Sequence, residues 1–213
     1  MNIIKKHLND SQYYKEEHPK TQIYLHHTVS STFHSTYMWW QETPDRVGTA
    51  YVVDKNGDIY ETFNPEYWSW HLGLGKGAYE KKSIGIELVC EGYLTKKGDQ
   101  IYWLDGDAKY NGKFIEREWR DQKYWAIYPK AQFYATVELV QHLSKKFNIE
   151  NNIITHYDYD EKLVMSYKGV LSHCNVRKDK TDISPAFDLE NFKFLTFPPD
   201  AEPIDTSNIE LQS

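Results

Sequence analysis

The chain has 213 residues, enough for one domain with a hydrophobic core, and its formal net charge is −6. That charge argues against sequence-independent binding of nucleic acid, which needs clustered lysine and arginine to neutralise phosphates. The two cysteines, Cys90 and Cys174, form no Cys-x-x-Cys pair, so we expect reduced thiols and neither a disulfide framework nor a thiolate zinc finger.

The N-terminal residues 1–20 are predicted to be a polar lead-in that lies over the domain. They lack the apolar stretch of roughly 7 to 15 residues that a secretory signal needs. No later run approaches the roughly 18 consecutive apolar residues of a membrane span. We therefore expect a protein that is made in the cytoplasm without a signal peptide and that does not insert into a membrane.

The next segments alternate between strand-like and helix-like patterns. Residues 21–26 form an apolar run, which predicts a buried strand that ends at His26. Ser30 or Ser31 can cap a helix that continues to about Gln41, because aromatic side chains recur there at helical spacing.

A hairpin and a central strand are predicted next. Residues 49–54 and 58–63 are strand-like and flank an Asn-Gly pair, which is a strong hairpin signal. Residues 83–89 are apolar enough for a strand at the centre of a sheet. Residues 91–124 have the pattern of an inserted hairpin or excursion, and nothing in them indicates a role.

The second half holds the clearest helix pattern of the chain. Residues 129–147 begin with proline, and apolar side chains recur in them at intervals of three and four. Further predicted elements are short strands at 153–156 and 170–176, a short helix near 185–194 and a disordered tail over 196–213. Strands mixed with helices imply a single α/β domain over residues 21–195, with a mixed central β-sheet flanked by helices.

Two distant stretches have the composition of one zinc site. The first stretch, at the end of a predicted strand, is Ile-Tyr-Leu-His-His-Thr at residues 23–28. The second, near the C-terminus, consists of Ser-His-Cys-Asn-Val at 172–176 and Lys-Thr-Asp at 180–182. Two neutral imidazoles and one carboxylate leave a fourth tetrahedral position for a water whose pKa the metal lowers to about 7. Structural zinc sites are normally closed by four protein ligands, so this pattern favours a catalytic one.

Five motifs in one order carry a family resemblance. They are His26-His27-Thr28 after its strand, Val47 to Asp54, Trp70-His71-Leu72-Gly73, Ser83-Ile84-Gly85-Ile86-Glu87, and Lys180-Thr181-Asp182. Together they resemble the type 2 N-acetylmuramoyl-L-alanine amidases, the family of bacteriophage endolysins and bacterial amidases related to peptidoglycan recognition proteins. The resemblance covers roughly residues 21–195. It implies hydrolysis of the amide between N-acetylmuramic acid and the L-alanine of the stem peptide, with one zinc ion as cofactor.

The resemblance also assigns metal ligands by matching motifs. His26 takes the position of the first zinc ligand, Asp182 that of the last and His173 that of the middle one. His156 is an alternative middle ligand, because it also ends a short apolar run where relatives often place this residue. His173 is favoured because it precedes Asp182 by nine residues, within the family range, whereas His156 precedes it by 26.

Catalytic and substrate-binding roles follow from the same motifs and from the chemistry. Amide hydrolysis needs a base that takes a proton from water and returns it to the leaving nitrogen, and Glu87 on the central strand suits this role. Lys180 can reach the developing oxyanion. Some relatives have a tyrosine where this chain has Thr49, so the proton transfer falls to Glu87. Trp70, His71 and Thr49 are expected to line the substrate groove.

The expected partner is peptidoglycan or a soluble muropeptide, bound by a monomer. We favour a phage-type endolysin that acts on the cell wall. The alternatives are a non-catalytic peptidoglycan-binding module, which would lack a zinc ligand, and a cytosolic amidase that recycles muropeptides.

Overall fold

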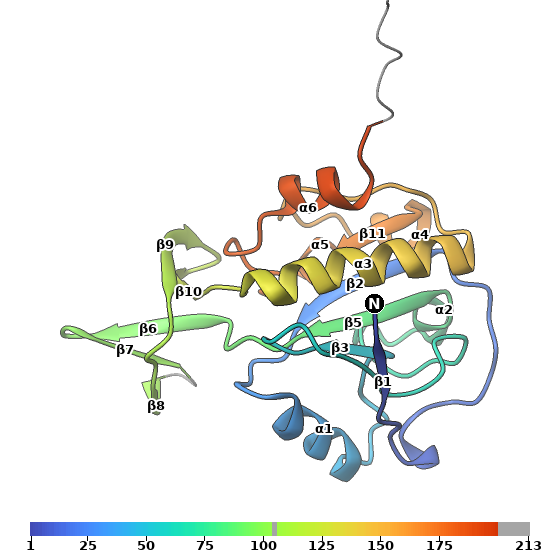
Figure 1. Cartoon of the computed structure of the whole chain (residues 1–213), viewed down its shortest axis with the longest axis horizontal. Coiled ribbons are helices and arrows are strands. Elements are labelled where there is room, and N and C mark those ends of the chain that lie inside the picture. The colour runs from blue at the N-terminus through green and yellow to red at the C-terminus, as the bar shows by residue number, and fades with distance from the viewer. Residues whose placement is uncertain (104–105, 200–213) are drawn as a thin grey trace, which may run out of the picture.

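The structure is a computed structural model that describes residues 1–103 and 106–199. At its centre lies a six-stranded sheet with the order β1-β4-β3-β5-β2-β11 (Figure 1). Its strands are β1 (Ile3–Lys5), β2 (Gln22–His27), β3 (Tyr51–Val53), β4 (Ile59–Glu61), β5 (Ser83–Leu88) and β11 (Gly169–Ser172). Strands β3 and β4 pair antiparallel around the predicted Asn-Gly turn, and the other neighbours pair parallel. The predicted α/β domain with a mixed central sheet is confirmed.

Side chains that alternate along β2 point to the two opposite faces of the central sheet. Every residue of β2 is buried. Ile23 and Leu25 belong to the main core, whereas Tyr24 packs in a second cluster on the other face, with Leu72 and Leu171. Because successive strand side chains point to opposite faces, His26 emerges on the face of Tyr24.

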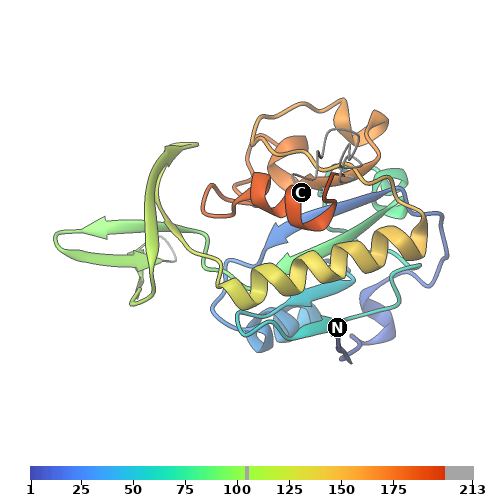
Figure 2. The ribbon, with the colours of Figure 1, turned by 45° about the horizontal axis from the view of Figure 1, so that its top comes forward.

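Helices cover the main-core face of the sheet. Helix α3 (Lys130–Phe147) crosses it, and α6 (Leu189–Thr196) packs beside α3 (Figures 1 and 2). The buried Gln132 side chain in the first turn of α3 donates to the backbone oxygens of Val53 and Val89, at 2.9 and 3.0 Å. Asn148 ends the helix in the left-handed conformation that favours a C-cap. The prediction of a helix over residues 129–147 is confirmed within one residue.

The cap of the first helix differs from the prediction. Helix α1 (Phe33–Glu42) is capped by Thr32, whose hydroxyl accepts the Ser35 N–H at 3.2 Å, and not by Ser30 or Ser31. The Ser30 hydroxyl instead contacts that of Thr36 at 2.9 Å. Ser30 is therefore used to hold the preceding loop against the helix.

Three further predictions are corrected by long-range pairing. The lead-in does more than lie over the domain, because β1 joins the sheet as an edge strand beside β4. The expected strand at 153–156 is only an isolated bridge between Ile153 and Val170. The strand expected at 170–176 ends at Ser172, and α5 (His173–Val176) follows. The Asn175 side chain accepts the Ser172 N–H at 2.8 Å and so turns the chain out of the sheet.

Like α5, the short helices α2 (Gly77–Lys81) and α4 (Leu163–Ser166) were not predicted, and a 3-10 turn covers Asp10–Gln12. The short helix expected near 185–194 is α6. Residues 200–213 of the predicted tail lie outside the described residues. Among residues 1–103 and 106–199, no helix is both long and apolar enough to cross a membrane.

The predicted excursion at 91–124 is a second sheet that projects from one side of the domain (Figures 1 and 2). Its strands are β6 (Tyr93–Lys97), β7 (Gln100–Trp103), β8 (Ala108–Lys109), β9 (Phe114–Trp119) and β10 (Gln122–Ala126). They pair antiparallel in the order β8-β7-β6-β10-β9. We call residues 93–126 the wing. It is anchored by Leu94 and Trp125, which are almost fully buried.

Candidate active site

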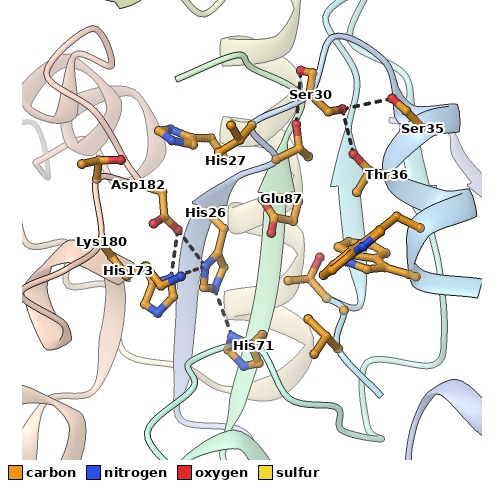
Figure 3. A pocket seen from close by; sticks show the side chains of 18 of the residues that line it. His26, His27, Ser30, Ser35, Thr36, His71, Glu87, His173, Lys180 and Asp182 are labelled. Carbon is orange, nitrogen blue, oxygen red and sulfur yellow. Dashed lines mark hydrogen bonds and ion pairs between the residues drawn. The ribbon is translucent and has the colours of Figure 1, made fainter. Parts of the chain in front are cut away.

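Three side chains that can ligate a metal converge at one edge of the central sheet (Figure 3). His26 stands at the end of β2 and His173 directly after β11, and these parallel neighbours end side by side. Asp182 lies on the loop after α5. The Nδ1 atoms of the two histidines are 3.0 Å apart, and each lies 3.0 Å from Oδ2 of Asp182. All three side chains are buried.

In both histidines the Nε2 atom is used in a hydrogen bond, which leaves Nδ1 free to bind a metal. His173 Nε2 donates to the backbone oxygen of Leu72 at 2.9 Å, so its Nδ1 carries the lone pair. His26 Nε2 is 3.0 Å from Nδ1 of His71 and can donate to it in the same way. Burial lowers the pKa of His26 to about 4, which keeps the ring neutral. Metal-ligating histidines typically donate their second N–H to a carbonyl or to another acceptor.

The residues fit a zinc ion on chemical grounds. Two lone pairs and a carboxylate oxygen that face one another at 3.0 Å repel unless a cation or proton lies between them. Two imidazoles and one carboxylate are a ligand set that zinc accepts, and three protein ligands leave a position open. His26, His173 and Asp182 are therefore the residues that would hold it.

His71 contacts His26 and is itself held in place by Ser83 and Glu80. Its Nε2 lies 2.8 Å from the Ser83 hydroxyl and 3.4 Å from Oε2 of Glu80. The Glu80 carboxyl, fully buried, accepts the backbone N–H groups of His71 and Leu72 at 3.1 Å. Burial raises the pKa of Glu80 to about 7 despite these bonds.

A glycine makes room for this arrangement. A Cβ atom added to Gly85 of β5 would lie 2.6 Å from Cγ2 of Thr49 and 3.1 Å from Nδ1 of His71. Both distances are shorter than ordinary van der Waals contacts. The Ser-Ile-Gly-Ile-Glu motif thus has a steric reason for its glycine, because His71 reaches His26 across that position.

Glu87 is the acidic side chain beside the candidate ligands. The register of β2 and β5 pairs His26 with Glu87, so both side chains emerge on the same face of the sheet (Figure 3). Within the described part of the chain, Oε2 of Glu87 is buried and has no hydrogen-bond partner. Burial, and then the negative charge of Asp182, raise the pKa of Glu87 well above its usual range. A carboxyl group in this state can hold a proton near neutral pH.

A cavity of about 520 Å³ opens over these groups. His26, His173 and Asp182 line it together with Glu87 and Lys180. Helix α1, with Ser35 and Thr36, forms the wall opposite the candidate ligands (Figure 3). Trp39 of this helix also lines the cavity and is 58% exposed, which places it at the rim. This volume is of the size expected for a small-molecule or peptide site.

The sequence matches the profile described as N-acetylmuramoyl-L-alanine amidase over residues 16–183, most of the chain. The chain belongs to this amidase family. Membership supports amidase activity on peptidoglycan. The matched range begins before the resemblance expected from residue 21 and ends before residue 195. A search of the curated proteins found no match.

Solved structures with the same fold agree with this family. A mutant endolysin from Bacillus subtilis is 18% identical with a TM-score of 0.57, and the alignment covers 92% of this chain and 99% of that one. The amidase LysC from Clostridium intestinale is 15% identical, with a TM-score of 0.52 and coverages of 91% and 95%. The E. coli amidase AmiD, in complex with an anhydro-N-acetylmuramic acid peptide, is 20% identical, with a TM-score of 0.54 and coverages of 85% and 59%.

Of the other predicted site residues, some line the cavity and some lie outside it. The alternative ligand His156 is away from the cluster, with a side chain that is 56% exposed and lies 3.5 Å from Asp158. Thr49 and His71 line the cavity, but the Thr49 hydroxyl donates to the Tyr51 backbone oxygen at 2.8 Å. Trp70, which was expected in the substrate groove, does not line this cavity, and its ring packs edge-on against Trp68.

Some residues of the site carried no recognisable sequence signal. Glu80 belongs to it only through His71, and no motif links a helix-end glutamate to a metal ligand. Ser83 opens the Ser-Ile-Gly-Ile-Glu motif, but its role comes only from the contact of its hydroxyl with His71. Trp39 reaches the rim through the placement of α1. His27, the neighbour of His26, points to the other face of β2, where its Nδ1 is 2.8 Å from the Tyr128 hydroxyl.

Proposed function

We propose that this protein is a zinc-dependent amidase that hydrolyses the bond between N-acetylmuramic acid and the L-alanine of peptidoglycan. The observation that carries the proposal is the buried group of His26, His173 and Asp182 in one cavity with Glu87, whose Oε2 has no hydrogen-bond partner among the described residues. A zinc ion held by the three ligands would supply a Lewis acid that polarises the amide carbonyl and lowers the pKa of water.

The side chains of this chain supply the proton transfers. Glu87 takes a proton from the attacking water and returns it to the amide nitrogen, so that the leaving L-alanine departs as a neutral amine. The raised pKa of Glu87 favours the intermediate stage at which the carboxyl holds that proton. Lys180 lines the same cavity and stabilises the negative charge that develops on the carbonyl oxygen.

The exposed aromatic face of Trp39 is suited to contact the sugar or the stem peptide at the cavity rim. We propose an endolysin setting with the cell wall as substrate, supported by the Bacillus subtilis endolysin among the structures of the same fold. Recycling of soluble muropeptides is the second candidate, since AmiD has the same fold and its structure contains a soluble peptide fragment of peptidoglycan.

The deciding experiment measures metal and products on one purified sample. We expect about one zinc per chain, release of stem peptides from cell walls, and loss of activity with a strong chelator that zinc restores. Full hydrolysis by metal-free protein would refute the zinc dependence. A zinc-free protein that binds walls without releasing peptides would indicate the non-catalytic binding module. Parallel assays on intact wall and on soluble muropeptide, with mass spectrometry of the products, separate the two settings.

A further inference from the structure

The wing reaches back to the loop that carries the candidate catalytic residues. At the tip of its β9–β10 hairpin, the Arg120 side chain donates to four backbone oxygens of residues 174–180. The acceptor distances are 2.8 Å to Cys174, 3.0 Å to Arg177 and 3.0 Å to Lys178, and the fourth acceptor is the backbone oxygen of Lys180. This segment, the ligand loop, connects His173 with Asp182.

The chemistry of this contact is specific to arginine. Four carbonyl oxygens that converge on one point repel one another, and a cation with several N–H donors relieves that repulsion. Nη1 contacts the oxygens of Arg177, Lys178 and Lys180, which share its two N–H groups, and Nη2 donates to that of Cys174. The rigid guanidinium plane therefore reaches the loop through two nitrogens, whereas a lysine ammonium has its three donors on a single atom. The Cys174 N–H also donates to the backbone oxygen of Asp182 at 2.7 Å, so the gripped segment is tied directly to both ligand positions.

The two-residue turn between β9 and β10 places Arg120 at a position that requires positive φ. Arg120 and Asp121 both have positive φ, 49° and 60°, at a tight turn where glycine or asparagine is usual. A long charged residue in this conformation costs free energy and commonly marks a functional constraint. The same end of the wing is braced by Trp119, whose ring meets that of Tyr157 edge-on with centroids 5.5 Å apart.

We propose that the wing is a clamp on the ligand loop and that Arg120 is a positioning residue for the amidase site. Arg120 acts through the backbone, by holding Lys180 toward the cavity and by keeping His173 and Asp182 at ligating distance. The inference rests on the proposed function for its catalytic consequence. The effect of the clamp on the mobility of the ligand loop can be measured whether or not the protein is an amidase.

The test compares Arg120→Ala and Arg120→Lys with the control Lys123→Ala. Lys123 lies on the same hairpin, but its partner is Glu116 of the wing, at 2.9 Å. The first readout is hydrogen–deuterium exchange of residues 174–182 in metal-free protein. We expect exchange there to rise about tenfold or more in Arg120→Ala, to rise less in Arg120→Lys and to stay at the parent rate in Lys123→Ala.

The second readout is zinc affinity by competition with a chromophoric chelator, together with kinetics of the loaded enzyme. Arg120→Ala should weaken zinc binding about 10- to 100-fold and lower kcat at least about tenfold with little change in KM. If residues 174–182 exchange at the parent rate and zinc affinity equals that of Lys123→Ala, the clamp is refuted. Should Arg120→Ala unfold, Arg120→Lys decides by the same criterion. A protected loop in a parent protein without zinc or activity would refute the proposed function and leave the clamp standing.

Discussion

At the scale of single residues, the proposed division of labour separates proton transfer from metal binding. Glu87→Gln and Lys180→Ala should each lower turnover by about 100-fold or more, because each removes a group that acts in the transition state. Neither side chain belongs to the cluster of candidate ligands, so zinc content should stay near that of the parent. Turnover and zinc content measured on the same samples test this. If Glu87→Gln keeps nearly full activity, the base lies elsewhere.

The two candidate middle ligands differ in position enough to be distinguished by single substitutions. His173→Ala should abolish stoichiometric zinc, since it removes one of three buried ligand atoms that lie 3.0 Å apart. His156→Ala should leave zinc content unchanged, because that side chain is largely exposed. Zinc is measured by atomic emission on gel-filtered protein. The reverse result would assign the ligand to His156.

Glu80 makes stability depend on pH in a defined direction. Burial raises its pKa from 4.5 to about 7, so between these values the folded protein binds more protons at this site than the unfolded chain does. Stability from this group is therefore fully present below about pH 4.5 and falls as the pH rises to about 7, by up to about 3 kcal/mol. In urea unfolding across this range, the stability difference between the parent and Glu80→Gln should follow that slope, because the lowered pKa values of His26 and His71 contribute the opposite trend in both proteins. Parallel profiles would contradict the prediction.

At the scale of elements, strand β5 contains both Glu87, the proposed base, and Gly85, where the absence of a side chain makes room for His71. Gly85→Ala should lower the free energy of unfolding by about 1–3 kcal/mol, because the new methyl group overlaps Thr49 and His71. Displacing His71 also removes the acceptor for His26 Nε2, so zinc should bind more weakly. The matched control is Gly77→Ala, whose Cβ would meet only ordinary contacts of 3.5 Å or more. Equal stability of the two variants, measured by urea unfolding, would show that β5 tolerates a side chain at Gly85.

At the scale of the whole molecule, two buried thiols report on global opening. Cys90 and Cys174 are fully buried, and burial raises the pKa of Cys90 to about 12 and that of Cys174 above its usual range. Folded protein should therefore react slowly with a thiol-specific reagent, and both thiols should react at once in denaturant. Titration of free thiols with and without urea measures this. Rapid labelling of a thiol in the folded protein would show that the domain opens locally around it.

Local patterns in the sequence were sufficient for the elements that depend on near neighbours. The long helix, the Asn-Gly hairpin and the strands that end at His26 and continue to Glu87 follow from periodicity, turn chemistry and apolar runs. These signals are local because burial of one face of a helix or strand imposes its own spacing on the residues. For this reason the α/β class and the family resemblance were both available from the sequence alone.

Tertiary structure decided the contacts that join distant segments. His26 and His173 are 147 positions apart, and only the pairing of β2 with β11 sets their distance. The support of His71 by Glu80 and the grip of Arg120 on the ligand loop have no local signature, because each depends on where a separate element packs. Sequence spacing determines which face of a helix or strand a side chain occupies. The order of strands in the sheet and the position of the inserted wing determine which distant residues that side chain contacts.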